Sequence, residues 1–357
     1  MTPAAMSAPP TIRYDHLYRL SDAHGLFEHA EFTVPRPEHG YCVDDVARGV
    51  VVLAREAAPS LRSSAQLDRY LAFVAAAQDS AGRLHNRFGT DHRWTDHAGV
   101  EDCWGRALWG WGTVASRVPA RASQALERFE SGARQRSEWK RSMAFAALGA
   151  AEILRRRPNH PAARALLADA VELIGDVPDE PRWCWPEWRL RYANAALAEV
   201  VIAAGALLDR PDCLGRGLRM LHWLLAAETR DGRLSVTPVG GWSAGEPRPG
   251  FDQQPIEVAA LADACATAYD VTGDPGWRTG VERCLAWFLG TNDVGVPLFD
   301  PVSFGGCDGL LPAGRNENQG AESTLSLLGT MQQAARLRIP FAAPLPVAPA
   351  GRAGLED

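Results

Sequence analysis

The amino-acid sequence predicts an all-α fold, an (α/α)6 toroid in which six helical hairpins set an inner ring of helices inside an outer ring. Apolar residues recur with the spacing of helices and do not alternate as they would in strands. Nearly uncharged segments alternate with amphipathic segments along the chain. This unit of two segments repeats every 40 to 65 residues, roughly, which is typical of stacked helical hairpins. An open helical solenoid is the alternative architecture.

The predicted inner helices are rich in alanine, leucine and valine, and small residues dominate them, as in the run from Met143 to Ala150. Helices that are apolar on nearly every side are usually buried, which places these segments in the inner ring. They cover residues 44–58, 101–117, 141–157, 192–209, 254–272 and 320–337.

The predicted outer helices are amphipathic and cover residues 64–78, 122–135, 161–174, 213–228 and 276–289. Three of them end in turns rich in Gly, Asp and Asn, which stop a helix. A shorter segment from Tyr14 to Leu20 precedes them all and could close the ring against the last inner helix. This closing segment and the regular inner helices favour a closed barrel.

We therefore expect a single barrel domain over residues 12–338. Residues 1–11 and the Pro/Ala-rich residues 339–357 are expected to be tails. The N-terminal residues lack the basic and apolar regions of a signal peptide, and no apolar stretch reaches the roughly 18 residues that a membrane-spanning helix needs.

Composition argues against several classes of partner. A net charge of −6 and a pI near 5.9 disfavour a nucleic-acid-binding or anionic-membrane surface. The seven cysteines form no CxxC pair, which favours reduced thiols and a cytoplasmic location. The sequence has no GxGxxG or phosphate-binding loop after a strand and no HExxH motif. We therefore predict neither a cofactor nor a metal.

Four polar loops that contain acidic residues open directly into predicted inner helices. An acid at a helix start caps free N–H groups, and for a single acid this explanation would suffice. It does not explain paired acids that are accompanied by Gln, Asn, Arg and Trp. Such side chains bind polyhydroxylated ligands and transfer protons on them. The four loops cover residues 40–48, 100–106, 251–257 and 316–323.

If every inner helix is followed by an outer helix that runs back, all inner helices are parallel and their N-termini share one mouth of the barrel. Asp45, Asp102, Asp252 and Glu322 should then meet there. Like charges that crowd one site raise some pKa values and leave others low, which separates an acid from a base. We predict Asp102 and Asp252 as the acid and base pair, with Asp45 and Glu322 as the alternatives.

The remaining polar and aromatic motif residues are predicted to bind the sugar. Carboxylates and amides suit vicinal hydroxyls, and indoles can stack on the apolar face of a sugar ring, although they also pack in cores. The tryptophans of the loop 183–188 fit both roles equally well. The predicted binding residues are Asp44, Arg48, Glu101, Trp104, Arg106, Trp242, Gln253, Gln254, Glu257, Asp308, Asn318 and Gln319.

With these motifs placed, the chain resembles a family of (α/α)6-barrel carbohydrate-active proteins that are often called glycosyltransferases or glycosyltransferase-associated and are similar to glycoside hydrolases. The matching strings are YCVDDVARG at 41–49, EDCWGRALW at 101–109, FDQQPIE at 251–257, GGCDGL at 305–310 and NENQGAES at 316–323. The resemblance implies sugar chemistry in the company of mannoside-processing enzymes. It fails at one place, where Tyr192-Ala193-Asn194 stands for the Tyr-Asp-Asn of other members.

The leading functional prediction is a glycoside hydrolase-like enzyme that cleaves or transfers a glycosidic bond of an oligosaccharide, with a mannoside among the candidates. A sugar isomerase or epimerase is the second candidate. Such chemistry commonly uses histidine as a base, and no histidine follows His222. A non-catalytic sugar-binding partner of a glycosyltransferase is the third. A transferase that uses a sugar nucleotide is disfavoured because no nucleotide-binding βα unit is present.

Overall fold

The computed structural model describes residues 12–178, 180 and 182–341. The inner helices are α2 (Val43–Ala54), α4 (Asp102–Arg117), α6 (Lys140–Leu154), α8 (Asn194–Leu207), α10 (Pro255–Thr272) and α12 (Ala321–Arg336). The outer helices are α1 (Asp15–Arg19), α3 (Leu61–Ala77), α5 (Ala122–Gly132), α7 (Pro161–Ile174), α9 (Pro211–Ala227) and α11 (Pro275–Phe288).

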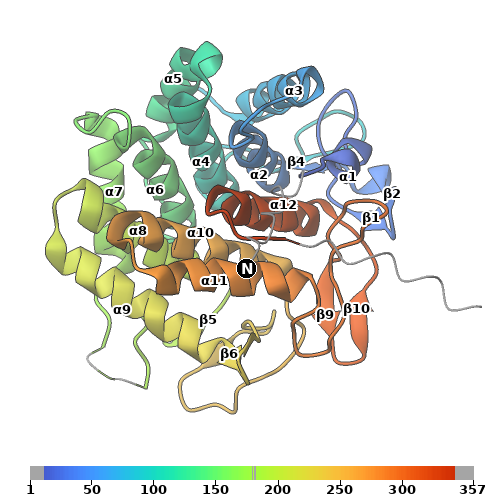
Figure 1. Ribbon diagram of the computed structural model, residues 1–357. Coiled ribbons are helices and arrows are strands. Elements are labelled where there is room, and N and C mark those ends of the chain that lie inside the picture. Colours follow the sequence, from blue (N-terminus) through green and yellow to red (C-terminus); the bar gives the residue numbers. More distant parts are fainter. Residues whose placement is uncertain (1–11, 179, 181, 342–357) are drawn as a thin grey trace, which may run out of the picture.

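The inner helices form a closed ring. Each packs against the next in the order α2, α4, α6, α8, α10, α12, and α12 returns to α2. Each inner helix also packs against an outer helix; α12 packs against both α11 and the short α1. Figure 1 shows the two layers plainly where α4 and α6 lie inside α5 and α7. The predicted (α/α)6 toroid is therefore confirmed, and the solenoid alternative is excluded.

Burial separates the two rings as their composition predicts. Every residue of α6 after Lys140 is buried, whereas α5 buries only Ala125, Phe129 and Gly132. A helix in the inner ring contacts other helices on nearly all sides, so only apolar or paired side chains are tolerated there. An outer helix needs one apolar stripe because its other face meets solvent.

Glycines let α4 and α6 approach each other closely. A Cβ atom added at Gly112 would lie 2.2 Å from the backbone oxygen of Gly149, and one at Gly149 would lie 2.2 Å from the oxygen of Leu108. Gly105 shows the same spacing against Ser142. Backbone contact of this kind leaves no space for any side chain, so these positions of the inner ring require glycine.

Short antiparallel strand pairs join the loops between the helices. They are β1 (Ala30–Glu31) with β2 (Val34–Pro35), β3 (Tyr41–Cys42) with β4 (Arg87–Phe88), β5 (Arg189–Leu190) with β8 (Trp242–Ser243), β6 (Thr229–Arg230) with β7 (Arg233–Leu234), and β9 (Gly309–Leu311) with β10 (Gly314–Asn316). Two 3₁₀ turns, Pro37–His39 and Pro119–Arg121, complete the described elements. The sequence prediction contained none of these strands.

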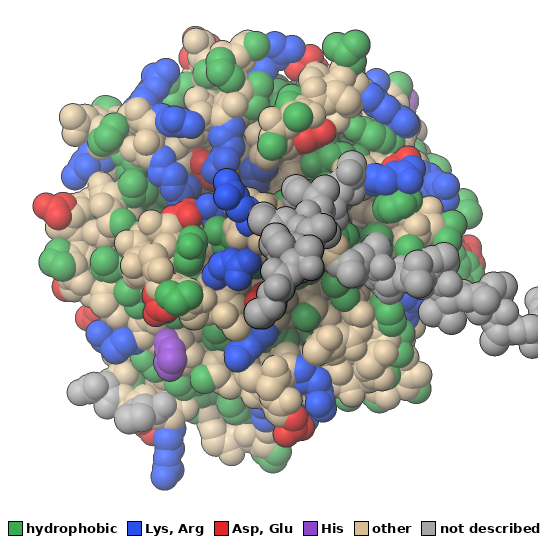
Figure 2. All heavy atoms as spheres, viewed as in Figure 1, with side chains coloured by type: hydrophobic (Ala, Val, Ile, Leu, Met, Phe, Trp, Pro, Cys, Tyr) green, Lys and Arg blue, Asp and Glu red, His purple; other side chains and the backbone are tan. Residues whose placement is uncertain are grey.

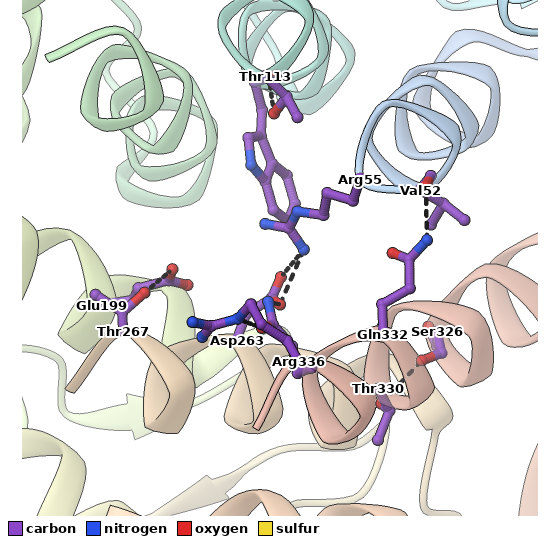
Figure 3. A network of polar contacts seen from close by, with 12 residues as sticks. Val52, Arg55, Thr113, Glu199, Asp263, Thr267, Ser326, Thr330, Gln332 and Arg336 are labelled. Carbon is purple, nitrogen blue, oxygen red and sulfur yellow. Dashed lines mark hydrogen bonds and ion pairs between the residues drawn. The ribbon is translucent and has the colours of Figure 1, made fainter. Parts of the chain in front are cut away.

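A buried ion pair crosses the barrel away from its mouth. Arg55, the residue that ends α2, donates two hydrogen bonds of 2.9 and 3.0 Å to the Asp263 carboxylate of α10. Figure 3 shows the Arg55 side chain reaching from its helix toward Asp263. Because α2 and α10 both flank α12 and are not neighbours in the ring, this pair links two inner helices across α12.

Figure 2 shows Lys and Arg side chains spread over one face of the molecule.

The edges of the predicted domain are only partly described. Residues 1–11 and 342–357, most of the two predicted tails, lie outside the described residues. Beyond position 338, Ile339 is buried and the Phe341 ring packs 6.2 Å from that of Phe299. No helix among the described residues is long and apolar enough to cross a membrane.

Candidate active site at the barrel mouth

A cavity of about 630 Å³ opens where the inner helices begin. Its polar floor comes from the first turns of α2, α4 and α12 and from the residues at the start of α10. Two loops form its rim, and the pairing of β5 with β8 holds them together. The lining residues are Asp44, Arg48, Asp102, Arg106, Gln254, Ile256, Glu257, Glu322, residues 189–192 and residues 237–241.

The cavity gathers predicted site residues from four of the inner helices. Of the predicted catalytic carboxylates, Asp102 and Glu322 line it. Of the predicted binding residues, Asp44, Arg48, Arg106, Gln254 and Glu257 line it as well. These residues are separated by up to 278 positions (322 − 44), so only the closed ring brings them together.

Arg106 connects two carboxylates of the floor. Its Nε lies 3.2 Å from Asp44 Oδ1, and its Nη2 lies 4.0 Å from Asp102 Oδ2. The guanidinium carbon lies 4.0 Å from the centre of the Phe145 ring, where a cation is attracted by the aromatic face. Asp102 accepts a hydrogen bond of 2.7 Å from the Tyr192 hydroxyl. Asp44 and Asp102 therefore share one cation but have different hydrogen-bond partners.

The side chains of Asp44 and Asp102 are 18% and 22% exposed, so the two acids differ in their neighbours more than in their burial. Asn86 Nδ2 donates to Asp44 Oδ2 at 3.2 Å, while the buried Asp44 Oδ1 has no hydrogen bond to any described group. Burial raises the pKa of Asp44, the cations Arg106 and Arg48 oppose this shift, and the nearby Asp102 charge adds to it. A carboxyl group in such surroundings holds its proton more readily than an ordinary aspartate.

Arg48 organises a second set of acids. Its Nη1 donates to Glu322 Oε2 at 2.7 Å and lies 3.4 Å from Asp45 Oδ1. Asp45 is 3% exposed and does not line the cavity. Burial raises the pKa of Asp45 to about 7, against the attraction of Arg48 and with the help of Glu322. Asp45 therefore lies behind the wall and interacts with Glu322 through Arg48.

Glu257 joins the start of α8 to α10. Its carboxylate accepts hydrogen bonds from the backbone N–H groups of Ala193 and Asn194 and from Asn194 Nδ2. Burial raises the pKa of Glu257 to about 8, the Glu228 charge adds to this, and the backbone donors oppose it. Ala193, the N-cap residue of α8, takes a left-handed conformation with φ of 46° and has no polar side chain to cap the helix. Glu257 thus caps the helix that Ala193 cannot cap.

Several predicted binding residues stabilise loops instead of lining the cavity. The Trp104 indole is fully buried and donates to the Gly132 carbonyl at 3.2 Å. Gln253 is fully buried between Trp287 and Asp293. These side chains sit behind the cavity wall because their helix and loop turn them toward the outer ring, so we leave them out of the proposed site.

The predicted binding residues before α12 also stabilise loops instead of lining the cavity. Gln319 is buried and donates to Asp300 at 2.9 Å, and Asn318 accepts from the Phe32 N–H at 2.9 Å. Asp308 accepts from the Gly320 N–H at 2.7 Å, just before α12. Each of these side chains uses its polar atoms to hold the loop that leads into the helix, which leaves Glu322 as the residue of the motif at 316–323 in the cavity.

Three further predicted residues lie near the mouth but outside its lining. The Asp252 side chain is exposed, and its carbonyl accepts from Val239, a rim residue, at 2.9 Å. Glu101 is exposed at the N-cap of α4. Trp242 is partly buried, donates to the Glu246 carbonyl at 3.0 Å and packs against Trp183. We therefore leave these residues out of the proposed site as well.

The cavity also contains residues that the motif search passed over. Tyr192, Arg189, Arg191 and residues 237–241 line it. No acid opens α8, so a search for acids at helix starts could not select this loop. The signal that was present is the tyrosine at the first position of the predicted inner helix 192–209.

A second, smaller cavity of about 60 Å³ continues along the barrel axis. It shares Arg48, Arg106 and Ile256 with the mouth cavity and ends among Glu199, Asp263 and other inner-ring residues. Its walls are mostly apolar, so the polar floor of the mouth cavity lies directly above an apolar space.

One trio of possible metal ligands lies beside the site. Atoms of Glu28, Cys42 and Asp45 lie within 4.8 Å of one another. Arg87 pairs with Glu28, Arg48 pairs with Asp45, and the Cys42 thiol donates to Asn86 at 3.4 Å. Burial raises the pKa of the Cys42 thiol well above its usual value. Each of the three side chains therefore has a protein partner, although the buried Asp45 Oδ1 accepts no hydrogen bond from a described residue, and the expected absence of a metal stays a prediction.

No protein-family model and no curated protein matches this chain. Among solved structures, it resembles a sugar epimerase from a ruminal bacterium, with a TM-score of 0.70, 10% identity and coverage of 92% of this chain and 96% of that one. It also resembles cellobiose 2-epimerase from Spirochaeta thermophila DSM 6192, with a TM-score of 0.68, 12% identity and coverage of 90% and 92%.

A third similar structure is the family 76 α-mannanase of Bacteroides thetaiotaomicron, with a TM-score of 0.61, 10% identity and coverage of 89% of this chain and 91% of that one. At such low identity these similarities concern the fold. They agree with the (α/α)6 barrel that the family resemblance implied.

Proposed function

We propose that this protein is a carbohydrate-active enzyme that cleaves a glycosidic bond near the end of an oligosaccharide. The observation that carries the proposal is the pair Asp44 and Asp102, which lie in the same cavity on either side of Arg106 but in unlike environments. Glycosidic-bond cleavage requires one carboxyl group that holds a proton and one that does not.

In this mechanism Asp44 is the general acid. Burial raises its pKa, so it can carry a proton and donate it to the bridging oxygen while the bond from that oxygen to the anomeric carbon breaks. Asp102 is the base. Its Oδ2 accepts a hydrogen bond from the Tyr192 hydroxyl, which fixes the carboxylate in the cavity. Asp102 takes the proton from the water that attacks the anomeric carbon.

Other cavity residues would hold the sugar. Glu322, fixed by Arg48, and Gln254 offer the acceptors and donors that neighbouring hydroxyls need. Asp252, the partner that the motifs suggested for Asp102, is replaced by Asp44 in this proposal because the Asp252 side chain is exposed outside the cavity lining.

A sugar isomerase is the alternative that shares this fold. Isomerisation requires a base that removes a proton beside a carbonyl, a role commonly filled by histidine. No histidine is among the described residues that line the mouth cavity. This observation supports bond cleavage over isomerisation.

The test is an activity screen on mannose-, glucose- and arabinose-containing oligosaccharides, with the products separated by chromatography. Asp44→Asn and Asp102→Asn should each lower turnover about 100-fold or more, with little change in melting temperature. Asp252→Asn should stay active.

Two results would decide against the proposal. Full activity of both Asp44→Asn and Asp102→Asn would remove the assigned pair. A product of the same size as the substrate but with altered stereochemistry or carbonyl position would instead identify an isomerase or epimerase.

A further inference from the structure

Exposed aromatic side chains gather beside the mouth cavity. Among the 12 tryptophans, all within the described part of the chain, only Trp139 and Trp188 are exposed, at 58% and 68%. Tyr192 is also exposed, at 41%, and it lines the cavity. An indole in water is unfavourable by the hydrophobic effect, and large exposed apolar groups that lie together mark binding surfaces.

The segments that carry these aromatic residues are bound to each other. Lys140, the residue after Trp139, donates to the Pro186 carbonyl at 3.2 Å. Arg141 donates to the Glu187 carboxylate at 2.8 and 3.0 Å and also to the Tyr192 carbonyl. The start of α6 and the loop 186–192 therefore form one surface next to the cavity.

Trp188 is held outward by its own loop. The neighbouring Trp183 and Trp185 are buried, at 6% and 1%, so they anchor the loop in the core. Trp183 Nε1 donates to the Glu187 carbonyl at 2.7 Å, and this closes a turn directly before Trp188. Trp183 and Trp185 therefore anchor the loop, and Trp188 does not contribute to this packing.

We propose that Trp188, Trp139 and Tyr192 form an aromatic platform that binds the part of the glycan chain that extends out of the cavity. The identity of this occupant rests on the proposed function. The platform is continuous with the cavity through Tyr192, and indole rings offer flat surfaces to the apolar faces of sugar rings.

The polar surroundings also fit a glycan. The Arg191 guanidinium is exposed at the cavity rim and has no hydrogen bond or ion pair with any described residue, so its donors are available to hydroxyl groups. Arg189 follows Trp188 and lines the cavity, and its guanidinium carbon lies 5.9 Å from the centre of the Trp188 ring. On this surface, aromatic side chains could stack on the apolar faces of the sugar rings, and the arginines between them could donate to the sugar hydroxyls.

The platform predicts that longer oligosaccharides bind better than short ones. We expect a disaccharide to occupy the cavity and a hexasaccharide to extend over Trp188. Stacking on the platform should strengthen binding of the hexasaccharide about tenfold over the disaccharide. Trp188→Ala should remove this gain and leave disaccharide binding unchanged, and Trp139→Ala should act in the same direction.

The experiment is isothermal titration calorimetry of the full chain with manno- and gluco-oligosaccharides, each as disaccharide, tetrasaccharide and hexasaccharide. Leu61→Ala is the matched control because Leu61 is 93% exposed but begins α3 at the other end of the barrel. It should retain the tenfold gain.

The outcomes separate the platform from the proposed reaction. A chain-length gain that depends on Trp188 supports the platform, even if the activity screen finds no bond cleavage. Equal binding of all lengths, a gain that Trp188→Ala leaves intact, or no binding of any oligosaccharide would overturn the platform, whether or not cleavage is found.

Discussion

At the scale of single residues, burial raises the pKa of one acid of the inner ring. Glu199 of α8 is 5% exposed and accepts one hydrogen bond, at 2.8 Å from the Thr267 hydroxyl. Burial raises its pKa to about 8, and the Asp263 charge adds to the shift. Figure 3 shows Glu199 and Thr267 near the Arg55–Asp263 pair. A neutral Glu199 at pH 7 is compatible with the apolar walls of the axial cavity.

This shift has a consequence for stability. Between the usual glutamate pKa and about 8, the folded protein keeps the Glu199 proton while the unfolded chain releases it, so the free energy of unfolding falls as pH rises. Glu199→Gln should remove this loss. The melting temperature of the variant minus that of the native chain should increase steadily from pH 5 to pH 8.

Thermal unfolding across this pH range measures the difference. Glu282→Gln, at an exposed position of α11, is the control and should show a difference that does not change with pH. A Glu199→Gln curve parallel to that of the native chain would show that Glu199 titrates normally in the fold.

At the scale of elements, the contact between α4 and α6 depends on glycine. Gly149→Ala would force the new methyl group against the Leu108 and Trp109 backbone, where the structure leaves 2.2 Å. The helices must separate to accept it, and overpacking of this kind typically costs about 1–3 kcal/mol. We expect Gly149→Ala to lower the free energy of unfolding by that amount or more.

Denaturant unfolding tests this prediction with a matched helix glycine. The nearest atom to a Cβ at Gly215 of α9 is the flexible tip of Arg219, at 3.6 Å. Gly215→Ala should therefore be neutral or stabilise by about 0.5–1 kcal/mol through helix propensity. Similar effects of the two substitutions would mean that the α4–α6 contact has room for a methyl group.

At the scale of the whole molecule, the Arg55–Asp263 pair links α2 to α10, two inner helices that are not neighbours in the ring. Its side chains are each 10% exposed, and Gln333 Nε2 of α12 also donates to Asp263 at 2.5 Å. Asp263→Ala would leave the Arg55 cation buried without its carboxylate. Removing one partner of a buried pair typically costs about 3–5 kcal/mol, and we expect a loss of that size.

The comparison is an exposed pair of similar geometry. Arg121 Nε lies 2.6 Å from Asp68 Oδ1, with side chains 38% and 45% exposed. Asp68→Ala should change the free energy of unfolding by about 0–1 kcal/mol, since solvent screens exposed pairs. Equal losses for Asp68→Ala and Asp263→Ala in denaturant unfolding would show that the pair does not hold the barrel together.

Local sequence determined the helices and their order. Composition alone separated the inner from the outer ring, because burial on all sides excludes unpaired charge whereas one-sided burial requires an apolar stripe. Helix ends were less certain. The segment 44–58 was predicted to be helical throughout, but α2 ends at Ala54, ahead of Pro59, which disfavours helical conformation in the residue before it. The α8 helix likewise begins at Asn194, two residues later than predicted.

The sequence by itself also predicted that Asp45, Asp102, Asp252 and Glu322 would meet at one mouth, because parallel inner helices place their first turns at one end. Of these, Asp102 and Glu322 line the cavity, together with Asp44, whereas Asp45 and Asp252 do not. Only the tertiary structure decided which polar side chains face the cavity. That choice depends on the rotation of each helix about its axis and on the loops that need hydrogen bonds. Gln253 and Gln319 are used by their own loops, whereas Tyr192 enters the site from a loop that has no acid at the start of its helix. Side-chain direction is a property of packing between distant segments, and no local pattern of residues encodes it.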